Sequence, residues 1–204
     1  MISHKHKCIF IHIPKCAGQS IEKWFCGRVY TCWDDTNKIH VQHSTARQIK
    51  RLYCKDYDQY FSFAFVRNPW DRSLSDYYWQ TRELNIQDSF KNYLLLSNNF
   101  NTPRLGYPHL DKSGRGDHLL PQTDFILNSA DKLMVDFVGR FENLQQDFDT
   151  ICDKIGIPQK ELPHKNKSNS NHKHYTEYYD DETRDIVAEK YAKDIEYLGY
   201  NFGE

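Results

Sequence analysis

The residues with the clearest chemical potential lie between positions 14 and 20, directly after an apolar run. This segment reads P-K-C-A-G-Q-S and supplies the ammonium group of Lys15, the permissive backbone of Gly18 and the hydroxyl of Ser20. A tight loop that leads from a strand into a helix can gather backbone N–H groups, a cation and a hydroxyl around one anion. Because Lys15 precedes Gly18, the G-x-x-x-x-G-K-[ST] spacing of the common nucleotide-triphosphate loop is absent. The segment therefore predicts a phosphate-binding loop of another kind.

A second group of polar residues follows another apolar run. Residues 65–78 read F-V-R-N-P-W-D-R-S-L-S-D-Y-Y, which indicates a strand, a turn and a helix. Arg67 lies before this helix and Ser75 lies about two helical turns later, so a single phosphate can contact both. Arg72 is on the same helix, and its role is open between an anion and an acidic neighbour.

Together, the two segments resemble the sulfotransferases that use 3′-phosphoadenosine 5′-phosphosulfate (PAPS). The branch they are most similar to contains the Golgi carbohydrate sulfotransferases, heparan sulfate 2-O-sulfotransferase among them, and soluble bacterial relatives. In that family the first loop reads roughly H-I-P-K-[TC]-[GA]-G-[TQ]-S and binds the 5′-phosphosulfate. The second reads R-N-P-x-x-R-x-x-S-x-Y and binds the 3′-phosphate. The resemblance extends to residues 139–144 and 197–202, so it covers nearly the whole chain.

The resemblance implies a transferase that moves a sulfuryl group from PAPS to an acceptor hydroxyl on a carbohydrate, without a metal, and releases PAP. Lys15 is then placed to stabilise the leaving phosphate, and Cys16 stands where the family has Thr or Cys. Ser20 donates its hydroxyl, caps the helix, or does both. A late loop of the family closes over the phosphates. The residues expected to bind the cofactor are Lys15, Cys16, Ala17, Gly18, Gln19, Ser20, Arg67, Ser75, Lys167 and Ser168.

An acceptor hydroxyl loses its proton as it attacks, and a histidine or a carboxylate within hydrogen-bond reach can take that proton. His43 is the candidate base, because its position resembles that of the catalytic histidine in heparan sulfate 2-O-sulfotransferase. His40 is the neighbour that could take its place. His12, at a strand end, is expected to be a buried, hydrogen-bonded residue. The catalytic residues expected are therefore Lys15 and His43.

The elements that position these residues alternate between strand and helix. Buried strands are predicted at residues 8–13 and 60–66, with short strands at 125–127 and 137–138. Helices are predicted at residues 20–28, 43–53, 69–82, 88–96, 142–155 and 180–198. This order predicts a single α/β domain over residues 1–204, a P-loop-like three-layer fold with a central parallel sheet and helices on both faces. Ligands bind beyond the carboxyl ends of the strands in such folds, where both motifs lie.

Two long loops are expected to be functional, with disorder as the alternative. Residues 97–122 are interpreted as a flap on the substrate side, and residues 158–175 as a strap on the cofactor side.

Composition limits the partners. The 204 residues carry a net charge of −1, so no overall field favours nucleic acid. No apolar run approaches the ~18–20 residues that span a bilayer, and no secretory signal is recognisable. A soluble, cytoplasmic protein is expected, with the soluble part of a membrane-anchored one as the alternative. The six cysteines form no C-x-x-C pair and predict no disulfide framework, although a bridge between Cys26 and Cys32 stays open. Neither the acceptor nor the oligomeric state can be predicted from the sequence.

Two other functions compete with sulfuryl transfer. A P-loop kinase-like phosphotransferase is disfavoured, because the Walker spacing is absent and no clear apolar strand ends in a magnesium-binding Asp. A non-catalytic nucleotide-binding protein could keep the same fold, and only an assay of turnover separates it from an enzyme.

Overall fold

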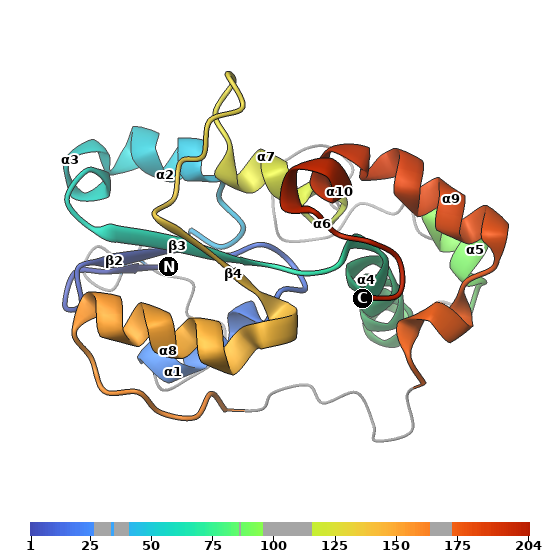
Figure 1. Cartoon of the computed structure of the whole chain (residues 1–204), viewed down its shortest axis with the longest axis horizontal. Coiled ribbons are helices and arrows are strands. Elements are labelled where there is room, and N and C mark those ends of the chain that lie inside the picture. The colour runs from blue at the N-terminus through green and yellow to red at the C-terminus, as the bar shows by residue number, and fades with distance from the viewer. Residues whose placement is uncertain (27–33, 35–40, 86, 96–115, 164–172) are drawn as a thin grey trace. The chain divides into compact units, whose positions relative to one another are not determined.

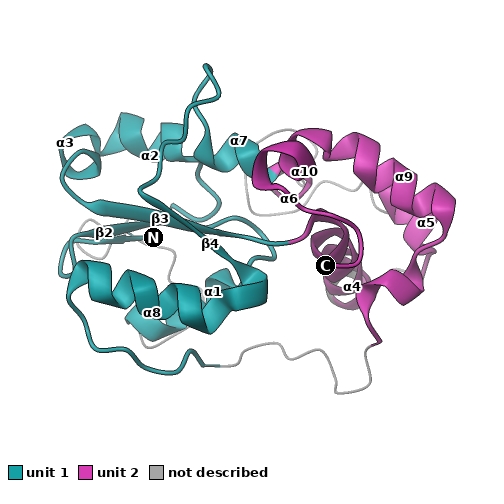
Figure 2. Ribbon diagram, in the orientation of Figure 1, with its two compact units in different colours: residues 1–67, 122–170 teal, residues 68–121, 171–204 magenta. Residues whose placement is uncertain are grey.

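The computed structural model of the chain describes residues 1–26, 34, 41–85, 87–95, 116–163 and 173–204. The chain divides into two compact units (Figure 2). Unit 1 comprises residues 1–67 and 122–170, and unit 2 comprises residues 68–121 and 171–204. The organisation as a single domain stays a prediction.

Unit 1 is built on a four-stranded sheet in the order β1-β2-β3-β4. Its strands are β1 (Ile2–Ser3), β2 (Cys8–Ile11), β3 (Phe61–Val66) and β4 (Phe137–Arg140). Strands β2, β3 and β4 run parallel, with Ile9 beside Ser62 and Phe63 beside Phe137, and β1 is antiparallel to β2. Strand β2 is wholly buried and β3 nearly so, as expected for inner parallel strands with continuous apolar sequences. The parallel sheet is thus confirmed, and β1 is an addition to it.

Helices cover both faces of this sheet (Figure 1). Helices α1 (Gly18–Cys26) and α8 (Leu144–Ile155) lie on one face, and α2 (Ala46–Leu52) and α3 (Cys54–Tyr57) lie on the other. A 3₁₀ turn, η1 (Phe141–Asn143), leads from β4 into α8. Between the sheet and α8, the ring of Phe25 packs on Phe63 and on Phe148, with centroids 6.3 and 6.1 Å apart. The predicted α/β class with helices on both faces is confirmed.

Unit 2 is helical. Its elements are α4 (Pro69–Leu84), α5 (Phe90–Leu94), α6 (Gly116–Leu119), the 3₁₀ helix η2 (Tyr175–Tyr178), α9 (Asp181–Lys190) and α10 (Ala192–Leu198). Asn68 caps α4 by accepting a hydrogen bond from the backbone of Trp70, and Pro69 occupies the first turn, where its missing N–H has no cost. The core of the unit consists of Trp70, Leu74, Tyr93, Leu94, Tyr175, Val187 and Tyr191.

Besides shifts of a few residues at the ends of other elements, three differences from the predicted elements have a clear physical cause. Residues 125–127 are not a strand: they fall in α7 (Gln122–Ile126) and in an isolated bridge between Leu127 and Leu133, because so short an apolar run has no distinguishing period. The helix predicted from residue 43 begins at Ala46, since Thr45 forms a capping box with Gln48. The helix predicted at residues 180–198 breaks at Tyr191, which is buried and has φ −115° and ψ 29°.

None of the helices in the described ranges is long and apolar enough to cross a lipid bilayer.

Candidate functional site

The loop between β2 and α1 has an unusual backbone. Lys15 and Ala17 both lie in the left-handed region, with φ of 69° and 62°. A residue with a Cβ pays about 1–2 kcal/mol there, and such strain is concentrated at functional sites. Left-handed residues that alternate with ordinary ones turn successive N–H groups toward a common point, which is the geometry of an anion-binding concavity. The local backbone is therefore compatible with a phosphate loop, and the binding of a phosphate there stays a prediction.

The side chains of this loop divide by exposure. Lys15, Ala17 and Gln19 are half-buried, whereas Cys16 and Ser20 are buried. Helix α1 begins at Gly18, so Ser20 lies within its first turn and does not cap it. The first N–H groups of a helix have no partner within the helix and can face an anion.

Gln122, a residue that the sequence motifs do not include, connects the two motifs. Its side-chain Oε1 accepts hydrogen bonds from the backbone N–H of Arg67 at 2.8 Å and from the thiol of Cys16 at 3.3 Å. Its Nε2 donates to the carbonyl oxygen of Arg67 at 2.8 Å. The side chain is fully buried. It thus holds the end of β3 against the loop that follows β2.

Arg67 is fixed from three sides within unit 1. Besides the backbone contacts to Gln122, its guanidinium donates to the carbonyl oxygen of Lys15 at 3.2 Å and lies 4.0 Å from the ring centroid of Phe141. Because β2 and β3 are adjacent and parallel, Lys15 and Arg67 follow carboxyl ends at the same edge of the sheet. Two cationic residues from the two motifs therefore meet where ligands bind in α/β folds.

A buried pair of histidines lies beside this loop. His12 directly follows β2, and its Nδ1 is 2.7 Å from Oε1 of Glu22 on α1. The ring of His43 is perpendicular to that of His12, with centroids 4.8 Å apart. His43 has a left-handed backbone, with φ 56°, in a turn where the N–H of Ser44 donates to the carbonyl of Val41 at 3.2 Å. The expectation of a buried, hydrogen-bonded His12 is confirmed, and His40 lies outside the described residues.

The remaining predicted residues belong to unit 2 or are not described. Ser75 is half-buried on α4 in unit 2, whereas Arg67 ends the first segment of unit 1, so their shared phosphate stays a prediction. Arg72 is buried and donates to the carbonyl oxygens of Leu120 and His118 at 3.0 and 3.1 Å, an anchor for the segment around α6. Lys167 and Ser168 lie outside the described residues, as do most of the flap and much of the strap.

Unit 2 contains a buried polar cluster to which the sequence motifs assign no role. The carboxylate of Asp76 on α4 is paired with His118 and accepts hydrogen bonds from Tyr93 at 2.9 Å and Gln80 at 2.6 Å. The ring of Trp79 stacks on that of His118 at 4.9 Å. These contacts join α4, α5 and α6.

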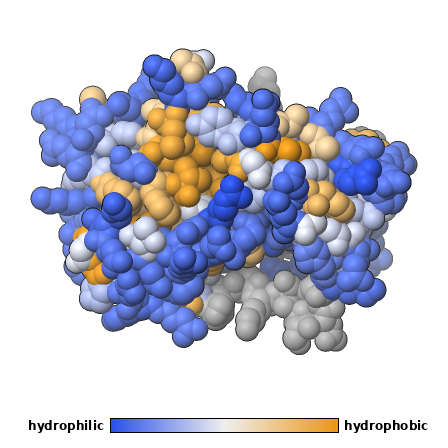
Figure 3. All heavy atoms as spheres, in the orientation of Figure 1, coloured by the Kyte–Doolittle hydropathy of each residue, from blue (hydrophilic) through white to orange (hydrophobic). Residues whose placement is uncertain are grey.

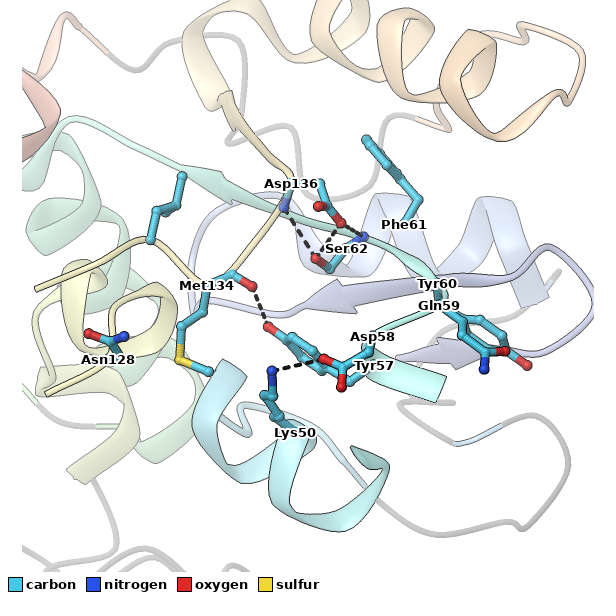
Figure 4. Close-up of a pocket in the computed structure, with 11 residues that line it drawn as sticks. Lys50, Tyr57, Asp58, Gln59, Tyr60, Phe61, Ser62, Asn128, Met134 and Asp136 are labelled. Carbon is cyan, nitrogen blue, oxygen red and sulfur yellow. Dashed lines mark hydrogen bonds and ion pairs between the residues drawn. The ribbon is translucent and has the colours of Figure 1, made fainter. Parts of the chain in front are cut away.

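A surface cavity of about 630 Å³ lies elsewhere in unit 1 (Figure 4). Its lining includes Lys50, Tyr57, Asp136 and Leu133, and it borders the amino end of β3 at Phe61. Figure 3 shows apolar residues gathered among hydrophilic ones on the face that carries the connection from α7 to β4, where Leu133 is 44% exposed. Since both motifs follow carboxyl ends of strands, this cavity is separate from the candidate site.

Within the described ranges, no group of three His, Cys, Asp or Glu side chains is placed to hold a metal ion.

Two known proteins and one family model are similar to this chain. An uncharacterized protein from Archaeoglobus fulgidus is 32% identical over 111 residues, which are 54% of this chain and 79% of that protein. The crystal structure of a sulfotransferase from Alicyclobacillus acidocaldarius aligns with a TM-score of 0.47 at 14% identity, over 94% of this chain and 84% of that one. The model of the sulfotransferase family matches residues 1–201, which include the phosphate loop, Arg67 and His43. The chain therefore belongs to the sulfotransferase family.

Proposed function

We propose that this sulfotransferase takes the sulfuryl group from PAPS and transfers it in line to a carbohydrate hydroxyl, with His43 as the general base and without a metal. Family membership supports sulfuryl transfer in general. The observation that carries the choice of donor is the pairing of a strained anion loop with Arg67 at one edge of the sheet, joined through the buried side chain of Gln122. PAPS has two separate phosphate-bearing ends, and the two motifs would provide a cation for each.

The loop residues account for the donor end of the reaction. Backbone N–H groups of the loop, other than those of Cys16 and Ser20, which bond within it, would hold the 5′-phosphosulfate together with the ammonium of Lys15. They would also stabilise the charge that develops on the leaving phosphate. The new S–O bond forms to the acceptor oxygen while the S–O bond to the phosphate breaks, so PAP departs with the electron pair. Arg67 and Ser75 would bind the 3′-phosphate, and Lys167 and Ser168 would close over the phosphates.

His43 would receive the proton of the acceptor hydroxyl. In support, His43 lies against His12, the residue that links β2 to the phosphate loop, so its ring is at the same edge of the sheet as Lys15. Its strained backbone is also of the kind found at functional sites. The carbohydrate class of the acceptor rests on the resemblance of the motifs.

The donor is tested by calorimetry with PAP in the presence of a chelator. We expect binding that EDTA does not weaken. Arg67→Ala should weaken PAP by about tenfold to a hundredfold, since a charge-assisted contact contributes ~1.5–3 kcal/mol, and should weaken adenosine 5′-phosphosulfate far less. Arg47→Ala, which removes an exposed arginine on α2, is the matched control and should bind PAP normally. Equal loss of both ligands in Arg67→Ala, or stabilisation by ATP with magnesium but not by PAP, would contradict the proposal.

Catalysis is tested with labelled PAPS on a panel of glycans, lipids and phenols. With the acceptor that is used best, His43→Ala should lower turnover by about 10²–10⁴-fold with little change in PAP affinity. Lys15→Ala should lower turnover and also weaken PAPS. His40→Ala should remain active. An inactive His40→Ala beside an active His43→Ala would move the base to His40, and activity confined to phenols or lipids would overturn the carbohydrate acceptor.

A further inference from the structure

Glu22 is a carboxylate in a place where an apolar residue would be expected. It lies on the buried face of α1, is 0% exposed, and has His12 within 2.7 Å. Removing an ionised carboxylate from water is unfavourable unless it is paired and hydrogen-bonded. A well-packed apolar pair is often as stable as a buried ion pair, so stability alone gives weak grounds for this one. The pair is better explained by what it positions.

The hydrogen bond to Glu22 fixes the ring of His12. With Nδ1 directed at the carboxylate, the opposite nitrogen, Nε2, lies against Gly18 at the start of α1. A Cβ built on Gly18 would collide with that nitrogen, so the glycine is required by the imidazole as well as by the phosphate loop. Since the loop backbone covers Nε2, His12 is poorly placed to take a proton from an acceptor.

The same imidazole also contacts the candidate base. The rings of His12 and His43 meet edge to face at an interplanar angle of 89°, and both residues are at least nine-tenths buried. His43 also has a left-handed backbone. One side chain, His12, therefore touches both the start of α1 and the ring of His43.

From these contacts we propose that Glu22 and His12 are positioning residues, which together hold the ring of His43 in a fixed relation to the loop that binds the 5′-phosphosulfate. The proposal rests on the role of His43 in the proposed function. It assigns no proton transfer to His12 or Glu22. Its consequence is that the position of the base relative to the phosphate loop is set by one buried pair.

The decisive variant is His12→Asn, because the asparagine amide can still donate to Glu22 while the ring that faces His43 is removed. We expect turnover to fall by about 10²-fold, the effect of a small misplacement of a reacting group, with PAP affinity and the KM for PAPS within about twofold of wild type. In a His43→Ala background the same substitution should have no further effect on turnover, because it acts through the residue already removed. Glu22→Gln keeps an acceptor for His12 and should retain more turnover than Glu22→Leu.

The matched control is another histidine–carboxylate pair of unit 1, in which the histidine is half-buried. His4 Nε2 lies 3.2 Å from Oδ1 of Asp34, which is fully buried, near β1. His4→Asn should leave turnover unchanged. Imidazole NMR gives a measurement that needs no acceptor: the His43 ring resonances, assigned by their loss in His43→Ala, should shift in His12→Asn and in Glu22→Leu but not in His4→Asn.

The outcomes separate the two proposals. If His43→Ala is inactive while His12→Asn has normal turnover and unshifted His43 resonances, the positioning role is wrong and the base assignment stands. If His43→Ala is active, the base assignment itself is wrong. A loss of turnover in His12→Asn that is equally large in the His43→Ala background would also overturn the positioning role.

Discussion

Replacing Gln122 with methionine tests whether one buried amide holds the two motifs together. Methionine has a similar volume, so the substitution removes the hydrogen bonds without leaving a large cavity. It deletes two bonds to the backbone of Arg67, each 2.8 Å long, and the weaker bond from the thiol of Cys16. A hydrogen bond contributes about 0.5–1.5 kcal/mol net, and a buried polar group left without its partner costs about 1–3 kcal/mol. We therefore expect Gln122→Met to lower the free energy of unfolding by about 2–4 kcal/mol.

The assay is urea unfolding, followed by tryptophan fluorescence, with and without PAP. Because Gln122 sets the backbone at Arg67, the variant should also gain less stability from PAP than wild type does at equal ligand concentration. Gln59→Ala, at an exposed position, is the control and should change the unfolding free energy by less than about 0.5 kcal/mol. A Gln122→Met protein as stable as that control, with normal stabilisation by PAP, would refute the reasoning.

Three further predictions concern the backbone and the core of unit 1. Ala17→Gly should raise the urea-unfolding free energy by about 0.5–1 kcal/mol, because relief of a left-handed φ of 62° exceeds the extra entropy of the unfolded chain. Gly139→Ala should lower it by ~1–3 kcal/mol, because a Cβ there would meet the buried ring of Phe65 at 2.5 Å; an unchanged melting temperature would exclude this overpacking. Burial raises the pKa of Tyr57 to about 12, so its stabilising contribution is complete below about pH 10 and declines as pH rises through about 12. Tyr57→Phe should therefore show a shallower alkaline loss of stability in urea unfolding between about pH 9 and 12, and a slope equal to that of wild type would exclude Tyr57 as its source.

The sequence predicts those parts of the fold that have a local cause. The apolar runs at residues 8–13 and 60–66 indicate buried parallel strands, and the structure pairs β2 and β3 in parallel. The residues between β2 and α1 indicate a phosphate loop, and the left-handed Lys15 and Ala17 give a backbone compatible with one, although the role of the loop stays a prediction. Pro69 marks the beginning of α4 correctly.

What the sequence does not predict depends on contacts between distant residues. Gln122 lies 55 residues from Arg67, and nothing near it in the chain distinguishes a buried, bridging amide from an exposed one. In the sequence, Glu22 cannot be distinguished from a solvated charge on an amphipathic helix. Its contact with His12 is known only from the fold. The break in the last predicted helix at Tyr191 is not marked by a glycine or a proline. It results from the packing of the Tyr191 ring in the core. The roles of His43, Arg67 and Ser75 stay predictions, because they concern a bound donor and acceptor.

The two hydrogen bonds between the backbone of Arg67 and the side chain of Gln122 also affect how the length of the chain between these residues can vary. The chain leaves unit 1 after Arg67 and re-enters it at Gln122. The side-chain amide of Gln122 bonds to both the N–H and the carbonyl oxygen of Arg67, as a neighbouring strand would, and so holds the two points together. With both ends of the intervening 68–121 segment joined in this way, the geometry of the phosphate loop depends on bonds inside unit 1 and not on the length of that segment. The segment contains α4, with the second motif, and part of the core of unit 2, so changes of length are expected between these elements and not within them. Such a change has a small cost, because each doubling of a flexible connection costs only about 0.6 kcal/mol.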